Sequence, residues 1–200
     1  MGPVYRSAGV YRLAMSVLEG REGAARRRLI ADAIPQGSSV LDLCCGDARI
    51  ARDLERRGCS YTGLDINPTF VRAGHRRGLD VRAWDARTMD FPEADVVCML
   101  SSLYHFVSRD RELLDRMVER ANRLVVISEP TSNWATSGSS LLRRVARWLT
   151  RVQGESFTDR YSQDSLRALV GHLPEDRVDF IEHGRDAVIL IRAEPVRSST

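Results

Sequence analysis

The 200-residue sequence contains no lysine, and all 30 of its basic residues are arginines. This absence excludes a lysine nucleophile, a Schiff base and the Walker phosphate loop, each of which requires a lysine amine. No apolar run reaches the roughly 18 residues of a membrane helix, because two serines and a histidine interrupt even the stretch 96–106. Arginines break the N-terminal apolar stretch, which also lacks a small-residue cleavage site, so no secretory signal is expected. We therefore expect a soluble, cytoplasmic protein with no membrane partner.

Metal-binding and disulfide patterns are missing as well. The four cysteines, Cys44, Cys45, Cys59 and Cys98, form no C-x-x-C pair, and none has a histidine at metal-ligand spacing. We expect reduced thiols and no metal. A concentrated basic footprint is also lacking, because 30 basic residues face 27 acidic ones, the net charge is +3, and the arginines are spread along the chain. The charge therefore argues against a nucleic-acid partner.

The sequence does contain a regular alternation of helical and strand patterns. Its 43% hydrophobic and 28% charged residues are typical of one globular domain. Helices are expected at 21–34, from 50 to the Gly58 stop, and at 69–77, 112–121 and 165–170, with strands at 40–43, 61–64, 80–83, 95–100, 123–128, 178–181 and 187–191. Strands that alternate with helices favour a parallel sheet. The sequence thus predicts a doubly wound α/β fold, with a mostly parallel seven-stranded sheet, a C-terminal antiparallel hairpin and helices on both faces.

The segment V-L-D-L-C-C-G-D-A at 40–48 is an apolar strand that runs into a turn of small residues before a helix. Such a turn lies at the carboxyl edge of the sheet, where small side chains let a ligand approach the backbone and the helix N-terminus offers N–H donors. A dinucleotide fingerprint requires G-x-G-x-x-G, whereas the matching positions hold Cys44, Gly46 and Arg49. Asp42, at the strand end, would also repel a phosphate. These features argue against a diphosphate ligand.

Two further aspartates follow the next two strands. Asp65 ends the second strand, and Asp85 follows the third. An acid at the end of the second strand is placed to accept hydrogen bonds from both ribose hydroxyls, as in dinucleotide folds, and Asp85 could accept one from an exocyclic amine. Asp42, Asp65 and Asp85 are expected to line one edge of the sheet. Together they predict a pocket for an adenosine whose substituent is not a phosphate.

With these motifs, the chain resembles the class I S-adenosylmethionine-dependent methyltransferases over 38–130. Their first motif, G-C-G-x-G after an apolar strand, is similar to 40–48, with Cys44 in the place of the first glycine and Ala48 in the place of the last. Their other motifs are similar to G-L-D-I-N at 63–67, W-D-A at 84–86 and the segment 95–106. The resemblance implies a Rossmann-like fold, S-adenosylmethionine as the cofactor and methyl transfer as the reaction.

The resemblance also assigns roles to single residues. It implies that Asp65 holds the ribose, that Ile66 packs against adenine, and that Asp85 and the Ala86 N–H bind the adenine amine and a ring nitrogen. The end of the fourth strand would contact the methionine amino group. The implied cofactor-binding residues are thus Asp42, Cys44, Cys45, Gly46, Asp65, Ile66, Asp85, Ala86 and Ser101. The two adjacent cysteines can also be understood simply as small buried side chains.

Residues for the methyl acceptor are expected beyond the cofactor motifs. His105, just past the fourth strand, is the candidate general base, because an imidazole titrates at about 6.5; alternatively, it caps or orders the loop. Glu129, at the end of the fifth strand, is a second candidate base or a substrate anchor, or else it pairs with an arginine. Tyr104, Trp134 and Tyr161 are candidate walls of an aromatic acceptor pocket, and each could equally belong to the core.

We expect one domain in four parts: an N-terminal helical cap at 1–37, a cofactor-binding half at 38–130, a lid-like insertion at 131–161, and a C-terminal helix and hairpin at 162–195. The insertion lies outside the shared motifs and is long for a connection, so it is expected to cover the substrate. Its segment 141–152 is amphipathic with an arginine-rich face. It could therefore be a lid, or only a helix that packs by its apolar side.

The expected function is that of an S-adenosylmethionine-dependent methyltransferase acting on a small-molecule acceptor, with O-, N- and C-methylation all open. The sulfonium already makes the methyl group electrophilic, so the protein mainly has to align the acceptor and exclude water. A base such as His105 would add about 10²- to 10⁴-fold for a hydroxyl or a protonated amine. Two alternatives stay open: an RNA methyltransferase, and a catalytically inactive S-adenosylmethionine-binding regulatory module, which the departures at Cys44 and Ala48 suggest.

Overall fold

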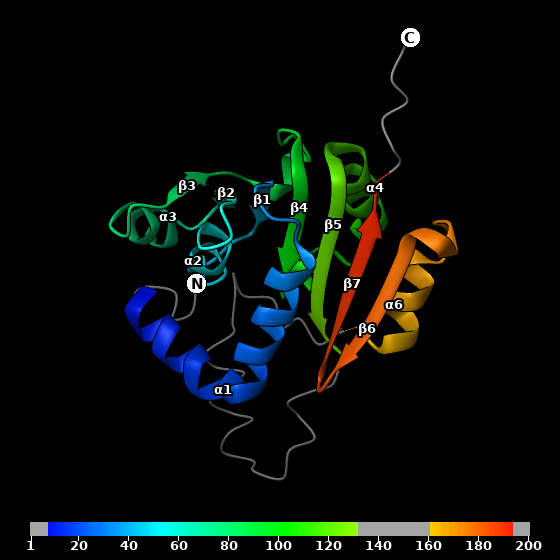
Figure 1. The fold of residues 1–200 in the computed structure, drawn as a ribbon, viewed down its shortest axis with the longest axis horizontal. Coiled ribbons are helices and arrows are strands. Elements are labelled where there is room, and N and C mark those ends of the chain that lie inside the picture. Colours follow the sequence, from blue (N-terminus) through cyan, green and yellow to red (C-terminus); the bar gives the residue numbers. More distant parts are fainter. Residues whose placement is uncertain (1–7, 132–160, 194–200) are drawn as a thin grey trace.

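A computed structural model describes residues 8–131 and 161–193 of the chain. Its helices are α1 (Ala8–Ala33), α2 (Ala51–Glu55), α3 (Pro68–His75), α4 (Asp110–Arg120) and α6 (Gln163–Val170), with short 3-10 helices η2 (Ala86–Thr88), η3 (Leu103–Phe106) and η5 (Glu175–Arg177). Its strands are β1 (Ser39–Leu43), β2 (Ser60–Asp65), β3 (Asp80–Ala83), β4 (Ala94–Leu100), β5 (Ala121–Pro130), β6 (Val178–His183) and β7 (Asp186–Arg192) (Figure 1). Within these two ranges, no helix combines the length and apolarity needed to span a membrane.

The strands form one seven-stranded sheet in the order β3-β2-β1-β4-β5-β7-β6 (Figure 1). The first five strands pair in parallel, whereas β7 lies between β5 and β6 and runs antiparallel to both. The predicted fold class, with its C-terminal antiparallel hairpin, is confirmed. From β1 the chain first builds outward to β3 and then returns to place β4 on the other side of β1. In open α/β sheets, ligands bind at the carboxyl ends of the strands where the order reverses in this way.

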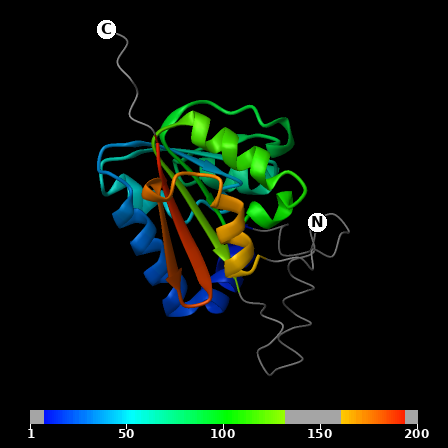
Figure 2. The ribbon, with the colours of Figure 1, turned by 90° about the vertical axis from the view of Figure 1, so that its right-hand side faces the viewer.

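The side chains of the strands alternate between two apolar layers, because successive residues of a strand point to opposite faces. On β1, Leu41 and Leu43 face the layer that is covered by α4 and α6. Val40 faces the opposite layer, which is covered by α1, α2 and α3. Figure 2 shows α1 on one side of the sheet and α4 with α6 on the other. By the same alternation, Asp42 points into the layer beneath α1.

The expected boundaries differ most at α1 and β5. The helix predicted at 21–34 already begins at Ala8 and contains a kink at Gly20, whose φ is 52° and ψ is −140°. Only the part after this kink carries the apolar periodicity that the sequence displayed. The strand predicted at 123–128 extends over Ala121–Pro130, because its pairing with β7 continues as far as Pro130 and Asp186. Pairing with neighbours, and not local apolarity, sets the ends of this strand.

Candidate functional site

The loop after β1 holds three alternate residues in the left-handed backbone region. The φ angles of Cys44, Gly46 and Ala48 are 55°, 55° and 49°. These are the three positions at which the first motif of the resembled family has glycine. A non-glycine residue pays about 1–2 kcal/mol in this region, because its Cβ approaches the following carbonyl oxygen. The loop therefore keeps the backbone shape of the glycine motif, although cysteine and alanine occupy two of its positions.

The hydrogen bonding of β1 and β2 continues past the strands into this loop. The Cys45 N–H donates to the carbonyl oxygen of Leu64 at 3.1 Å. The Gly46 N–H donates to Oδ2 of Asp65 at 2.8 Å, and the Asn67 N–H donates to Oδ1 of Asp65 at 2.7 Å. Asp65 is 7% exposed, and burial raises its pKa while the two backbone hydrogen bonds oppose the rise. A carboxylate offers about four acceptor positions, so Asp65 can still accept from a ligand diol.

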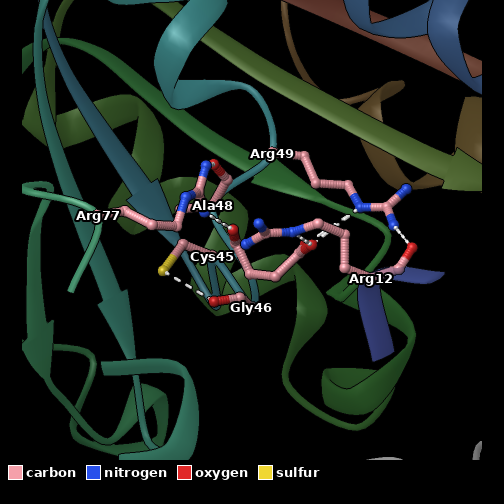
Figure 3. A network of polar contacts seen from close by, with 7 residues as sticks. Arg12, Cys45, Gly46, Ala48, Arg49 and Arg77 are labelled. Carbon is pink, nitrogen blue, oxygen red and sulfur yellow. Dashed lines mark hydrogen bonds and ion pairs between the residues drawn. The ribbon is translucent and has the colours of Figure 1, made fainter. Parts of the chain in front are cut away.

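Three arginines fix the same loop from outside (Figure 3). Asp47 is 5% exposed and accepts from Nε of Arg12 at 3.1 Å and from Nε of Arg49 at 3.2 and 3.1 Å. Arg49 also donates to the Arg12 carbonyl oxygen at 2.5 Å. Arg77, after α3, donates to the carbonyl oxygens of Asp47 at 2.5 Å and Ala48 at 3.5 Å. The arginines thus tie the loop to α1 and to the end of α3.

Asp42 lies beneath the loop and does not project from the sheet edge. It is 2% exposed; the Tyr61 hydroxyl donates to its Oδ2 at 2.7 Å, and Sγ of Cys98 donates to its Oδ1 at 3.6 Å. Burial raises its pKa to about 7, although the hydrogen bonds from Tyr61 and Cys98 lower it. Asp42 was expected to line the edge of the sheet with Asp65 and Asp85; its side chain is buried beneath the loop, where it lines the cavity described below. The alternation of β1 turns this side chain toward the α1 layer.

Gly63 makes room for this buried polar cluster. A Cβ at Gly63 would lie 2.7 Å from Sγ of Cys45 and 3.0 Å from the hydroxyl oxygen of Tyr61. Real Cβ atoms do not approach other atoms so closely, and the missing side chain therefore lets Tyr61 reach Asp42. Burial raises the pKa of Cys45 well above its usual value, so this thiol stays protonated.

Asp85 and Ala86 lie at an open end of the site. Asp85 caps η2 by accepting from the Arg87 N–H at 3.0 Å, and it accepts from the Arg87 guanidinium at 2.9 Å on Oδ1 and 2.5 Å on Oδ2. These hydrogen bonds from Arg87 lower the pKa of Asp85. Ile66 is 49% exposed, and Ala86 is buried. An adenine amine would have to share Asp85 with Arg87.

A cavity of about 100 Å³ opens between the loop after β1, the second half of α1 and the end of β4. Five of the nine residues expected to bind the cofactor line it: Asp42, Cys44, Cys45, Gly46 and Ser101. Arg26 and Arg27 of α1 also line it. Typical ligand pockets measure roughly 300–1,000 Å³, so this cavity corresponds to part of a ligand site. The pKa of Cys44 is raised chiefly by burial and then by the carboxylates of Asp65, Asp42, Glu129 and Asp85, which all act on this one thiol.

The candidate acceptor residues gather around η3. The rings of Tyr104 and His105 lie 4.0 Å apart, centroid to centroid, at an angle of 41°. Glu129, which is 1% exposed at the end of β5, accepts at Oε1 from the Leu103 N–H at 2.6 Å. It therefore holds the first residue of the segment that carries His105. Tyr161 is buried, and its hydroxyl donates to Oδ2 of Asp110 at 2.7 Å.

Trp134 and the arginine-rich segment 141–152 lie outside the described residues. Sequence reasoning missed the roles of Arg12, Asp47 and Arg77 in fixing the loop, because nothing local links residues so far apart in the chain. The role of Gly63 was also missed, although the G-L-D-I-N motif contained it. A glycine in the middle of a strand is itself a signal of close approach.

The reversal of strand order and the left-handed loop bonded to Asp65 are features of a Rossmann-like fold. In agreement, a family model described as a methyltransferase domain matches residues 40–127, and this match supports the resemblance. A search of curated protein sequences finds no match.

Solved structures share the whole fold. The chain is similar to an O-methyltransferase family protein from Burkholderia thailandensis, with 17% identity, a TM-score of 0.67, and coverage of 95% of this chain and 60% of that chain. It is also similar to human N-acetylserotonin methyltransferase in complex with SAM. The identity is 21%, the TM-score is 0.65, and the match covers 95% of this chain and 57% of that chain. The chain thus spans only 60% and 57% of the length of these two proteins.

A third similar structure has nearly the same length as this chain. It comes from a complex between the Haloferax volcanii Trm112 methyltransferase activator and the putative methyltransferase. The identity is 13%, the TM-score 0.66, and the coverage 96% of this chain and 98% of that chain. At these identities, the three structures establish the shared fold.

Proposed function

We propose that this protein binds S-adenosylmethionine and transfers its methyl group to a small-molecule acceptor. The observation that carries the proposal is the left-handed loop after β1, whose Gly46 N–H is bonded to Asp65. This arrangement joins the segment that would contact the methionine portion to the carboxylate that would hold the ribose. The match of a methyltransferase domain to residues 40–127 supports the same assignment.

The residues present fit an adenosyl group bearing a positive charge. Asp65 retains acceptor capacity for a diol, and Ile66 offers an exposed apolar side chain next to it. Asp65, Glu129 and Asp85 supply negative charge around the loop, and Asp42 adds to it when ionised, as their common effect on Cys44 indicates. Such a field favours a sulfonium and disfavours a phosphate chain. When bound, S-adenosylmethionine supplies a methyl group that is already electrophilic.

The protein's own contribution is to orient the acceptor and to move one proton. His105 is the candidate base on η3, and Glu129 holds the first residue of that helix through the Leu103 N–H. Glu129 is in this sense a positioning residue. Tyr104, Trp134 and Tyr161 stay candidate contacts of the acceptor, although the hydrogen bond from Tyr161 to Asp110 favours a role in the core.

The small-molecule assignment rests on charge and on the similar structures. The net charge of +3, spread along the chain, is too low for the electrostatic footprint of an RNA-binding enzyme. The human relative is named for N-acetylserotonin, a small molecule. The alternative of an inactive binding module was suggested by the replacement of glycine at Cys44 and Ala48. Both residues keep the left-handed backbone conformation, so these replacements no longer favour that alternative.

Two measurements test the proposal. Titration calorimetry should detect binding of S-adenosylmethionine, and Asp65→Ala should weaken it by about 1–3 kcal/mol, because ribose hydroxyls would lose their buried acceptor. Incubation with methyl-labelled donor should then transfer label to a host small-molecule fraction and not to host RNA. Binding that is unaltered in Asp65→Ala would refute the placement of the donor, and label in RNA alone would refute the acceptor class.

A further inference from the structure

Asp42 is a buried carboxyl on the wall of the cavity that the methyl donor is proposed to enter. Its surroundings on the sheet are apolar, since Val40, Val96 and Val126 belong to the same buried layer. Each carboxyl oxygen has one hydrogen-bond donor, the Tyr61 hydroxyl at 2.7 Å and the Cys98 thiol at 3.6 Å. Neither donor carries a charge. A single ionised carboxyl in such a place is costly unless a cation approaches it.

The ionisable groups that face Asp42 reinforce this need for a cation. From β2 and β4 these are Tyr61, Asp65 and Cys98, and from the loop after β1 they are Cys45 and Asp47. The carboxylates of Asp65 and Asp47 both raise the pKa of Asp42. The arginines that line the cavity are Arg26, Arg27 and Arg49. Arg26 pairs with Asp186 at 2.8 Å and Arg49 with Asp47 at 3.1 Å, and none of the three is among the groups that shift the pKa of Asp42.

We propose that Asp42 distinguishes the methyl donor from its demethylated product by charge: it releases its proton when the sulfonium-bearing donor binds and keeps it when the uncharged thioether binds. This inference rests on the proposed function, because it requires the donor to enter this cavity. The donor carries a sulfonium and an ammonium against one carboxylate, whereas S-adenosylhomocysteine carries only the ammonium and the carboxylate. The one positive charge of difference lies at the reacting sulfur.

The pH dependence of binding follows from the protonation of Asp42. Its pKa in the free protein is about 7, so near neutral pH the carboxyl is partly protonated. A ligand that prefers the ionised form lowers this pKa, so its affinity is complete above the free pKa and falls as the pH drops through it. We expect donor binding to weaken about tenfold between pH 8 and pH 6, and product binding to change much less. The preference for donor over product therefore grows as the pH rises.

Calorimetry of both ligands tests this inference. At pH 7, titrations in two buffers of different ionisation enthalpy should reveal that S-adenosylmethionine releases more protons than S-adenosylhomocysteine. The sulfonium also lowers the pKa of the donor's own amino group relative to that of the product, and Asp42→Asn, which lacks only the titrating carboxyl, gives this ligand contribution as a baseline. The difference between the ligands should shrink to that baseline in Asp42→Asn, together with the pH dependence of their ratio. Equal proton release by both ligands in the wild-type protein, or a difference of the same size in Asp42→Asn, would overturn the inference.

A second variant keeps the test decisive if Asp42→Asn does not fold. Tyr61→Phe removes the hydrogen bond that lowers the pKa of Asp42, so the midpoint of the pH dependence should move upward. A merely structural role would weaken binding equally at every pH, and that result would refute the inference. Asp80→Asn, at an exposed carboxyl bonded to Thr62 and Arg82, is the matched control and should leave proton release unchanged.

The two proposals fail in different ways. If the wild-type protein binds neither ligand at any pH, the proposed function is wrong. If it binds both ligands with the same pH dependence, the donor site stands and only the role of Asp42 is wrong.

Discussion

The two ends of the proposed donor site differ in how deeply their side chains are buried and in how many contacts hold them in place. At the loop end, Asp42 and Tyr61 are buried, at 2% and 7% exposed, and Cys45 is half-buried. The open end, formed by Ile66, Asp85 and Ala86, is exposed at Ile66, and the side chain of Asp85 is 33% exposed beside Arg87. At a buried end, a change in side-chain volume or charge costs free energy, whereas at an open end solvent accommodates such a change. We therefore expect the protein to distinguish the charged donor from its uncharged product at the loop end.

The largest effect is expected from Asp42→Asn on the pH dependence of stability. The pKa of Asp42 rises from 3.8 to about 7 on folding, so this group stabilises the fold at low pH and the benefit is lost as the pH rises toward 7. Its contribution to the free energy of unfolding should change by up to about 1.4 kcal/mol per pH unit in this window. Urea unfolding at pH 4.5 and pH 7 should therefore show a smaller decline for the variant. Identical declines would mean that Asp42 does not titrate in this range.

Gly63→Ala should destabilise the loop end, because the added methyl group has no space there. The added Cβ would meet Sγ of Cys45 at 2.7 Å and the hydroxyl of Tyr61 at 3.0 Å, so overpacking should cost about 1–3 kcal/mol of unfolding free energy. Thermal or urea unfolding measures the loss. The double variant Gly63→Ala/Cys45→Ala removes the closer contact and should recover part of it. A fully stable single variant would disprove the close packing described for this cluster.

Asp85→Ala should have the smallest effect, because the open end is solvated and Arg87 already shares the carboxylate. We expect donor binding to weaken only slightly, and clearly less than in Asp65→Ala. Arg87→Ala is the matched control, and it should leave affinity unchanged or slightly higher, since it removes a competing donor. If Asp85→Ala weakened donor binding as much as Asp65→Ala does, the two ends of the site would contribute equally to affinity.

The sequence predicted the layers and the order of elements, because apolar alternation and helical spacing are local signals. The hairpin of β6 and β7 was predicted for the same reason, but the insertion of β7 between β5 and β6 depends on pairing between distant segments. Asp65 was expected at the strand end and lies there. Its bond to the Gly46 N–H could not be predicted, since it depends on the register of β1 against β2.

The environment of Asp42 illustrates the same limit. The sequence located it at a strand end and expected it at the rim, but the direction of its side chain depends on which face of β1 lies under α1. Tyr61 and Cys98 come from neighbouring strands, and the register that sets Asp42 opposite Cys98 is a property of the assembled sheet. Composition and motif spacing carry no information on such pairs.

The bonds from Cys45 to Leu64 and from Gly46 to Asp65 make the ends of β1 and β2 a single rigid unit. A ligand that contacts both segments does not have to draw them together. The backbone entropy of this alignment is lost during folding and not during association, which favours affinity from few contacts. Exchange of donor for product can then proceed without any rearrangement of the sheet edge.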